Sequence, residues 1–336
     1  MHIPENYLSP STCAVMTGVM VPVWAHAIKK VKEEIPKSKM PLLGISAAFS
    51  FVGMMFNVPL PGGTTGHAVG GTLIAVILGP HAACISITIA LLLQALLFGD
   101  GGILALGANC FNMAFVLPYL GYGIYKLIAG KSSSVTRQLV GAGIGSYVGI
   151  NAAAFFAAIE FGIQPMLFHD AAGQALYCPY GLPISIPAMM IGHSTIFGLA
   201  EIIFTVAILA FVMKTSGSKD SLFQPTSHTA LSQKPLLVLL GLLICAVPLE
   251  LLAEGTAWGE WGTDEISSII TKGSALGYTP KGMTHGFSLQ TLLPDYSVAG
   301  LPDVAGYIVS AIIGITLLII VFRLIAAKMS DTAGVK

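Results

Sequence analysis

Apolar segments separated by short polar connections run along most of this chain of 336 residues. Two of them, 40–99 and 102–125, contain no Lys, Arg, Asp or Glu, and each is longer than the roughly 20 residues that cross a bilayer as a helix. A helix near 67–79 is short for a full crossing, which indicates a half-helix or one that starts inside a protein-lined cavity. The apolar runs and the Gly and Pro breakers between them predict helices near 10–27, 41–58, 67–79, 82–99, 104–128, 138–162, 185–213, 236–252 and 304–326.

The composition agrees with a protein embedded in lipid. Only 10% of the residues are charged, 54% are hydrophobic, and the mean hydropathy is +0.81, whereas soluble domains contain about 25% charged residues. The chain is therefore predicted to be an all-α integral membrane protein. Its net charge of +0 gives no reason to expect a nucleic-acid partner, and its 5 cysteines form no CxxC pair typical of zinc sites.

The positions of Lys and Arg predict how the helices cross the membrane. If the first helix starts outside, all 16 basic residues except Lys272 and Lys281 fall on the cytoplasmic side, as the positive-inside rule requires. These two lie in a long outer loop, and such loops cross regardless of charge. The pattern predicts a seven-helix bundle followed by two additional transmembrane helices, with the N-terminus outside. No basic segment precedes the first helix, so a cleaved signal peptide is not expected.

A polar segment divides the chain into two predicted units. Residues 214–235 are rich in Ser and Thr and contain a Pro, which is typical of a linker and here predicts a cytoplasmic one. It separates a seven-helix unit, 1–213, from a two-helix unit, 236–336. We interpret the outer loop of the second unit, about 253–303, as a solvated acidic loop without a ligand. Its acidic residues are Glu254, Glu260, Asp264, Glu265, Asp295 and Asp303.

The first two residues, Met1 and His2, form a potential metal chelator. The terminal amine and the backbone nitrogen of His2 close a five-membered ring on a metal ion, and the same backbone nitrogen and the imidazole Nδ1 close a six-membered ring. Three nitrogens then lie in one plane, and one further imidazole completes a square. Square-planar nitrogen sites suit Ni(II) and Cu(II) and discriminate against zinc and magnesium.

His67 is the candidate for the fourth nitrogen. It ends the glycine-rich segment 59–67, PLPGGTTGH. Glycines allow the backbone to approach a bound ion closely, and Thr64 or Thr65 could orient the imidazole through a hydrogen bond. The alternative is a loop that caps the following helix and leaves His67 in solvent.

Three motifs resemble the CbiM/NikM family, the substrate-binding S components of energy-coupling-factor transporters for cobalt and nickel. They are MHIPENYLS at the start, PLPGGTTGHAVGG at 59–71 and LLFGDGGILALGANCFNMAF at 96–115. The resemblance covers roughly 1–213. The segment LLPDYSVAGL at 292–301 is similar to the small CbiN/NikN partner, here joined to the same chain.

The resemblance implies a metal held by the amine of Met1, the backbone and side-chain nitrogens of His2 and the imidazole of His67. It also implies partner proteins, namely a membrane coupling (T) subunit and cytoplasmic ATPases that supply the energy. One departure is Asn6, where the family usually has Gly. Asn tolerates a left-handed backbone better than most residues, so the chain path is expected to be similar.

Further polar residues occur in or beside the apolar segments. Asp100 is expected at the outer end of a helix, as a cap or as a charge that attracts the metal. Asn109 and Asn112 lie three apart on one helix face, and because buried amides need partners they could support the N-terminal segment. His193 and Glu201, eight apart on one helix face, either belong to the metal path or pack against a polar neighbour.

Three classes of function can be compared. The tripeptide GKS at 130–132 lacks the upstream glycine of a phosphate-binding loop, because Tyr125 takes that position, so the chain is not expected to bind nucleotide. A membrane metalloenzyme needs an open coordination position, which a closed square of nitrogens does not offer. A proton-driven carrier that uses Glu201 and His193 is the alternative. The sequence predicts a transporter subunit in the cytoplasmic membrane of a prokaryote that captures Ni2+ or Co2+ from outside as its substrate, not an enzyme.

Overall fold

The chain is mostly helical in the computed structural model, which describes residues 1–60, 64–215, 233–252, 257–271 and 274–328. The strands among these residues form two short antiparallel pairs. In the first, β1 (Val58–Pro59) pairs with β2 (Thr65–Gly66), and in the second, β3 (Ile270–Thr271) pairs with β4 (Ser274–Ala275). The helical fold class predicted from the sequence is confirmed to this extent.

The helices follow the order in which the apolar runs predict them. Up to residue 215 they are α1 (Pro10–Glu34), α2 (Met40–Met55), α3 (Gly71–Leu78), α4 (Pro80–Leu93), α5 (Leu106–Asn109), α6 (Leu117–Ala129), α7 (Val135–Gly162), α8 (Gln164–Leu167), α9 (Leu182–Gly192) and α10 (Gly198–Thr215). After residue 232 they are α11 (Gln233–Ala246), α12 (Lys281–Thr284) and α13 (Asp303–Lys328). Short 3-10 segments are η1 (Lys37–Lys39), η5 (Val247–Leu252) and η6 (Pro294–Tyr296). Three π-helical segments continue helices without a break: η2 (Gln94–Phe98), η3 (Cys110–Val116) and η4 (His193–Phe197).

The predicted helix near 67–79 begins later than the apolar pattern indicates. Residues 65–66 belong to β2, and α3 starts only at Gly71. Gly70, directly before it, has φ +70°, a left-handed conformation that Gly adopts at little cost. His67 therefore lies in an extended segment before the helix, not in its first turn.

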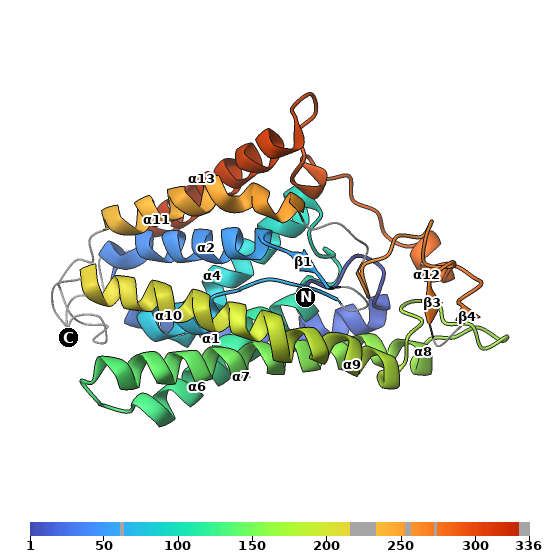
Figure 1. The fold of residues 1–336 in the computed structure, drawn as a ribbon, viewed down its shortest axis with the longest axis horizontal. Helices are drawn as coiled ribbons and strands as arrows, with labels where there is room; N and C mark the ends of the chain where they lie inside the picture. The colour runs from blue at the N-terminus through green and yellow to red at the C-terminus, as the bar shows by residue number, and fades with distance from the viewer. Residues whose placement is uncertain (61–63, 216–232, 253–256, 272–273, 329–336) are drawn as a thin grey trace.

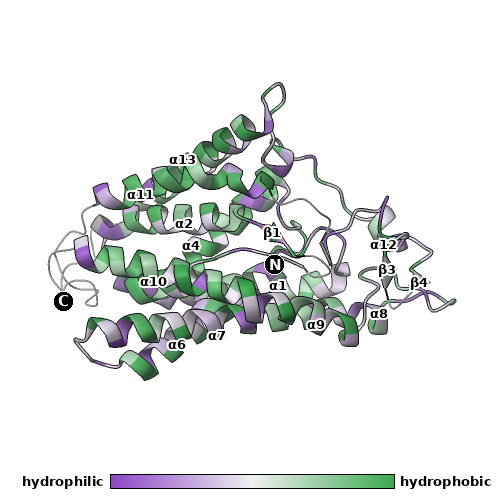
Figure 2. Ribbon diagram, in the orientation of Figure 1, coloured by the Kyte–Doolittle hydropathy of each residue, from purple (hydrophilic) through white to green (hydrophobic). Residues whose placement is uncertain are grey.

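Six helical stretches are long and apolar enough to cross a membrane among the residues that the structure describes. They are Pro10–Glu34, Pro80–Phe98, Val135–Leu167, Leu182–Thr215, Lys234–Leu252 and Asp303–Lys328. The helix Met40–Met55 is apolar but shorter. Figure 2 shows hydrophobic residues along the helices, while hydrophilic ones gather at their ends and in the loops. The chain is thus a multi-pass membrane protein, and the count of seven plus two crossings stays a prediction.

Small residues let α13 of the second predicted unit pack closely along α2 of the first. Figure 1 shows α11 and α13 on the same side of the bundle as α2. Gly44 of α2 lies against Phe322 of α13, and a β-carbon on Gly314 of α13 would overlap the ring of Phe51. Close approach of this kind is how helices associate where lipid gives no hydrophobic driving force. The predicted linker at 214–235 falls mostly outside the described residues.

The N-terminal segment runs back into the bundle, and Figure 1 shows the start of the chain among the helices. Met1, His2 and Ile3 are 2%, 5% and 0% exposed. Asn109 holds this segment, because its Oδ1 accepts a hydrogen bond from the Ile3 N–H (2.8 Å) and its Nδ2 donates to the Ile3 carbonyl (3.1 Å). At the far end Ser9 caps α1 by accepting from the Thr12 N–H (3.1 Å).

The outer loop of the second unit is less solvated than its acidic composition suggests. Asp264, Asp295 and Asp303 are exposed as expected, and Glu254 lies outside the described residues. Trp258 and Trp261, however, are buried against the first unit, and Glu260 between them reaches Thr65. The interpretation as a purely solvated loop is wrong because its tryptophans need an apolar surface to cover.

Candidate metal centre

The terminal amine of Met1 lies in the interior beside the β2 segment. It donates a hydrogen bond to the carbonyl oxygen of Thr65 (3.2 Å). Burial lowers the pKa of this amine, while the nearby carboxylates of Glu260 and Asp100 oppose that shift. A lower pKa favours the neutral amine, which has the lone pair that a metal ion needs.

The imidazoles of His2 and His67 lie against each other, with ring centroids 4.7 Å apart and ring planes tilted by 31°. They are 5% and 2% exposed. Nε2 of His2 and both ring nitrogens of His67 have no hydrogen-bond partner among the described residues, while Nδ1 of His2 has a carboxylate neighbour, Asp100. Buried polar atoms are almost always paired, so this set of nitrogen donors fits a metal ion as its missing partner.

The expected donors include main-chain atoms. Among the described residues, His, Cys, Asp and Glu side chains alone form no group of three that could hold a metal ion. A metal ion at this place would therefore need main-chain donors in addition to these side chains. The structure brings together Met1, His2 and His67 but does not itself show which of their nitrogens bind.

Asp100 lies beside His2, with Oδ1 3.0 Å from Nδ1 of the imidazole. Its other oxygen, Oδ2, accepts hydrogen bonds from the hydroxyl of Tyr296 (2.5 Å) and from Nε2 of Gln94 (3.1 Å). Burial alone raises the pKa of Asp100, but His2, Tyr296 and the Met1 amine together hold it below the ordinary value. Asp100 is thus an anion in contact with the nitrogen that the chelate requires.

Thr64 and Thr65 are both buried. The carbonyl oxygen of Thr65 accepts a hydrogen bond from the Met1 amine, and the hydroxyl of Thr65 donates one to the carboxylate of Glu260. The carbonyl of Thr64 accepts from the Leu60 N–H (3.3 Å). These hydrogen bonds place Thr65 beside the terminal amine and Thr64 in the loop backbone, and none of them reaches the imidazole of His67.

The two asparagines expected to support the N-terminal segment have different contacts. Asn109 pairs with the main chain of Ile3, as described above. Asn112 instead donates through Nδ2 to Glu160 of α7 (2.8 Å). Only the first of them touches the N-terminal segment directly.

Glu201 supports the loop that carries His67. Its carboxylate accepts hydrogen bonds from the N–H groups of Val69 (2.7 Å) and Gly70 (3.0 Å), at the start of α3. Carboxylates are favoured at this end of a helix because its N–H groups are unpaired and its dipole is positive there. Glu201 therefore has a polar neighbour, the second of the two roles considered for it.

Three contacts from the second unit reach the N-terminal segment or its neighbours. The hydroxyl of Tyr7 donates to the Trp261 carbonyl (2.8 Å), and Tyr296 holds Asp100. Asn6 pairs with the main chain of Phe287 through both ends of its amide, at 2.8 and 3.0 Å. Their partners lie more than 190 residues away in the sequence, so no local pattern could have indicated them.

Glu260 is a further residue that the sequence interpretation missed. Burial raises the pKa of its carboxyl group, and the Met1 amine, Thr65 and His2 lower it in part. A weak signal was available, because the loop 257–261, AWGEW, places this carboxylate between two tryptophans. Aromatic residues on both sides of a charge are unusual in a solvated loop.

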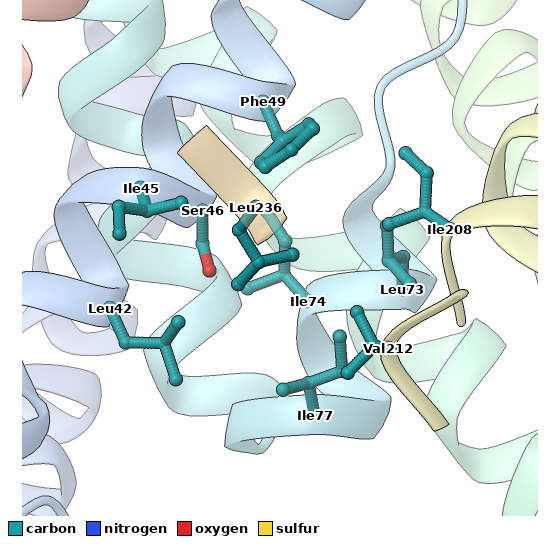
Figure 3. A pocket seen from close by; sticks show the side chains of 10 residues that line it. All are labelled: Leu42, Ile45, Ser46, Phe49, Leu73, Ile74, Ile77, Ile208, Val212 and Leu236. Carbon is teal, nitrogen blue, oxygen red and sulfur yellow. The ribbon is translucent and has the colours of Figure 1, made fainter. Parts of the chain in front are cut away.

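An apolar pocket lies apart from these residues, between α2, α3, α10 and α11 (Figure 3). Its lining contains Ser46 and otherwise aliphatic side chains and Phe49. It offers no nitrogen or carboxylate ligand, so it is not a second candidate for the metal.

Comparison with known proteins gives two matching families in succession. Residues 2–218 match the family described as "Cobalt uptake substrate-specific transmembrane region" (CbiM), and residues 233–330 match the PDGLE domain. The "Probable fused nickel transport protein LarMN" of Lactiplantibacillus plantarum is 48% identical over 96% of this chain and 97% of its own length. The "Fused nickel transport protein NikMN" of Rhodobacter capsulatus is 44% identical over 95% of each chain.

A solved structure is similar as well. The "Crystal Structure of an Truncated Transition metal Transporter" shares 56% sequence identity with this chain and superposes with a TM-score of 0.61. The superposed region includes 64% of this chain and 99% of the solved chain.

Proposed function

The chain belongs to the CbiM family of cobalt uptake substrate-specific transmembrane proteins, with a PDGLE domain joined to it, and from this premise we propose that it is the specificity subunit of an energy-coupling-factor transporter. It captures Ni2+ or Co2+ outside the cell. A membrane coupling subunit and cytoplasmic ATPases supply the energy, since the sequence contains no phosphate-binding loop. The alternative, a proton-driven carrier, needs no such partners.

One observation carries this proposal. A buried terminal amine lies near two adjacent imidazoles, and three of their four ring nitrogens lack a hydrogen-bond partner among the described residues. We propose that the amine of Met1, the backbone and Nδ1 nitrogens of His2 and one nitrogen of His67 bind the ion in a square. Planar nitrogen ligands and the Irving–Williams order favour Ni2+ over Co2+, and the fused relatives named above are nickel transport proteins.

The proposed arrangement in the membrane follows the distribution of basic residues. Met1 faces the outside of the cytoplasmic membrane of a prokaryote. The seven-helix unit, 1–213, carries every proposed ligand, the segment 214–235 links it on the cytoplasmic side, and the unit 236–336 contributes the outer loop.

Two carboxylates assist capture in this proposal. Asp100 attracts the cation and holds Nδ1 of His2 until the metal takes its place. Glu260 lies close enough to the Met1 amine to influence its pKa, and it serves as a transient oxygen ligand while water on the incoming ion is exchanged for nitrogen. Oxygen ligands suit an ion that is still hydrated, and nitrogen ligands suit its final state.

An N-terminal extension tests the proposed chelate. One extra residue before Met1 moves the amine away from His2, and we expect it to abolish stoichiometric Ni2+ binding together with the visible absorption of planar Ni(II). His2→Ala and His67→Ala should have the same effect. The measurement is metal analysis and absorption of the full chain purified in detergent.

A matched control is His169→Ala, which removes an exposed imidazole and should leave binding intact. Unchanged thermal unfolding of the metal-free variants shows that the fold is kept. If the extended chain still holds one planar Ni2+ per molecule, the proposed ligand set is wrong.

A further inference from the structure

His193 lies in a π-helical segment that packs against the loop carrying His67. It is the first residue of η4, the π-helical segment between α9 and α10. Such segments are rare and often occur at functional sites. The side chain is 0% exposed, so both of its ring nitrogens must find partners within the protein or with a bound species.

The hydrogen bonding of His193 fixes its tautomer. Nδ1 lies 2.8 Å from the carbonyl oxygen of Met189. A carbonyl only accepts, so Nδ1 carries the proton and Nε2 keeps a free lone pair. Nε2 is buried and has no hydrogen-bond partner among the described residues. Metal-binding histidines usually have this arrangement, with one nitrogen held by a carbonyl and the other directed at the metal.

The η4 segment packs against the loop that carries His67. The ring of Phe197 lies 5.1 Å from that of His193, and a β-carbon on Gly66 would overlap Phe197. Glu201, on the same continuous helix, binds the N–H groups of Val69 and Gly70. The residues before and after His67 are therefore both fastened to the helix that presents His193.

We propose that Nε2 of His193 is the next ligand for the transported ion, which passes from the N-terminal chelate to a site shared by His67 and His193. This step rests on the proposed function. His67 keeps its bond to the ion, while His193 and water replace the amine, the backbone nitrogen and the imidazole of the first two residues. The backbone nitrogen of His2 regains a proton from water as it leaves. Two imidazoles without a chelate ring bind more weakly than the square, so this is a transit site.

The test uses the full chain with one extra residue before Met1, which weakens the outer chelate and exposes the properties of the second site. Ni2+ and Co2+ alone are titrated into this chain in detergent. We expect weak residual binding that falls by about tenfold or more with His193→Asn, a loss typical of the lower range for disturbed metal sites. Asn can still donate to the Met189 carbonyl but lacks Nε2. His169→Ala, as a matched control, should change nothing.

A second measurement does not depend on a substitution at position 193. X-ray absorption of the Ni2+-loaded extended chain that also carries His2→Ala should show two imidazole ligands, from His67 and His193. One imidazole overturns the proposal, and so does residual affinity that His193→Asn leaves unchanged.

The native N-terminus separates this proposal from the proposed function. With Met1 in place, His193→Asn should still bind one planar Ni2+ per chain, because the square is complete without it. Loss of planar binding in this otherwise folded variant makes His193 a resident ligand and contradicts the transit role. Retention of native affinity by the extended chain instead contradicts the outer chelate.

Discussion

At the scale of single residues, the centre combines neutral donors with a fixed anion. Burial favours the uncharged amine of Met1 and the uncharged imidazole of His67, while Asp100 stays ionised next to His2. In the proposed set a cation gains a negative neighbour and meets an amine and an imidazole that are already neutral, so the main proton it displaces is that of the His2 backbone amide. We therefore expect Asp100 to contribute to metal affinity through its charge and through the orientation of His2.

Asp100→Asn should lower the affinity for Ni2+ by about tenfold, at the lower end of what groups that orient metal ligands contribute. Asn keeps the size of the side chain and can still accept from Tyr296, so the loss reports the charge and the contact with Nδ1 of His2. Calorimetric titration of the full chain measures it. Asp264→Asn, a change at an exposed carboxylate in the outer loop, is the matched control, and an equal effect of both substitutions would count against a specific role.

Sequence alone indicates the central donors but not the residues that hold them. The chelate follows from the adjacency of Met1 and His2, because ring closure depends only on bonded neighbours. Asn6 was expected to tolerate a left-handed backbone, and it has φ +64°. The Asn6 side chain also forms two hydrogen bonds with the main chain of Phe287. No local pattern reveals this contact, because the two residues lie 281 positions apart.

At the scale of elements, apolar runs predict helices well where burial and lipid exposure alone decide them. The start of α3 was placed too early because Ala68 and Val69 extend the apolar pattern, whereas Glu201 from another helix accepts hydrogen bonds from the N–H groups of Val69 and Gly70. The outer loop was misjudged for a similar reason. Its charges are visible in the sequence, but the surface that its tryptophans cover is not.

The outer loop is fastened to the N-terminal segment through Asn6, and this contact can be removed without straining the backbone. Asn6→Gly keeps the left-handed conformation but loses two hydrogen bonds, each contributing about 0.5–1.5 kcal/mol. The outer loop is then held less firmly, so its residue Glu260 is less often positioned beside the Met1 amine. We expect Ni2+ capture to slow by about threefold. The equilibrium affinity should change little, because a transient ligand speeds binding and release of the ion alike.

Stopped-flow absorption of planar Ni(II) measures the rate of capture. Thr279→Ala is the control, since the hydroxyl of Thr279 donates to the Thr263 carbonyl within the loop (3.3 Å) and does not reach the N-terminal segment. Equal rates in wild type and Asn6→Gly would show that this contact has no part in loading.

At the scale of the whole molecule, binding and energy coupling are expected to separate. Every proposed ligand lies within 1–213, and the face of α2 that α13 covers is apolar, so lipid or detergent can replace α13. The fragment 1–213 should therefore bind one metal ion per chain. It lacks Glu260 and Tyr296, which lie beside the amine and hold Asp100. Deleting the second unit should accordingly slow metal capture far more than it weakens equilibrium binding.

Uptake distinguishes the specificity subunit from a self-contained carrier. Metal accumulation is compared in cells that produce the full chain or the fragment 1–213, each with and without the coupling subunit and the ATPases. We expect sustained accumulation only by the full chain with its energising partners, because the sequence contains no phosphate-binding loop. A proton-driven carrier predicts something different, namely accumulation by the full chain alone that collapses when the proton gradient is dissipated. Robust uptake without any ATPase would therefore overturn the subunit assignment, while leaving the metal centre at Met1, His2 and His67 as the place where the ion is first bound.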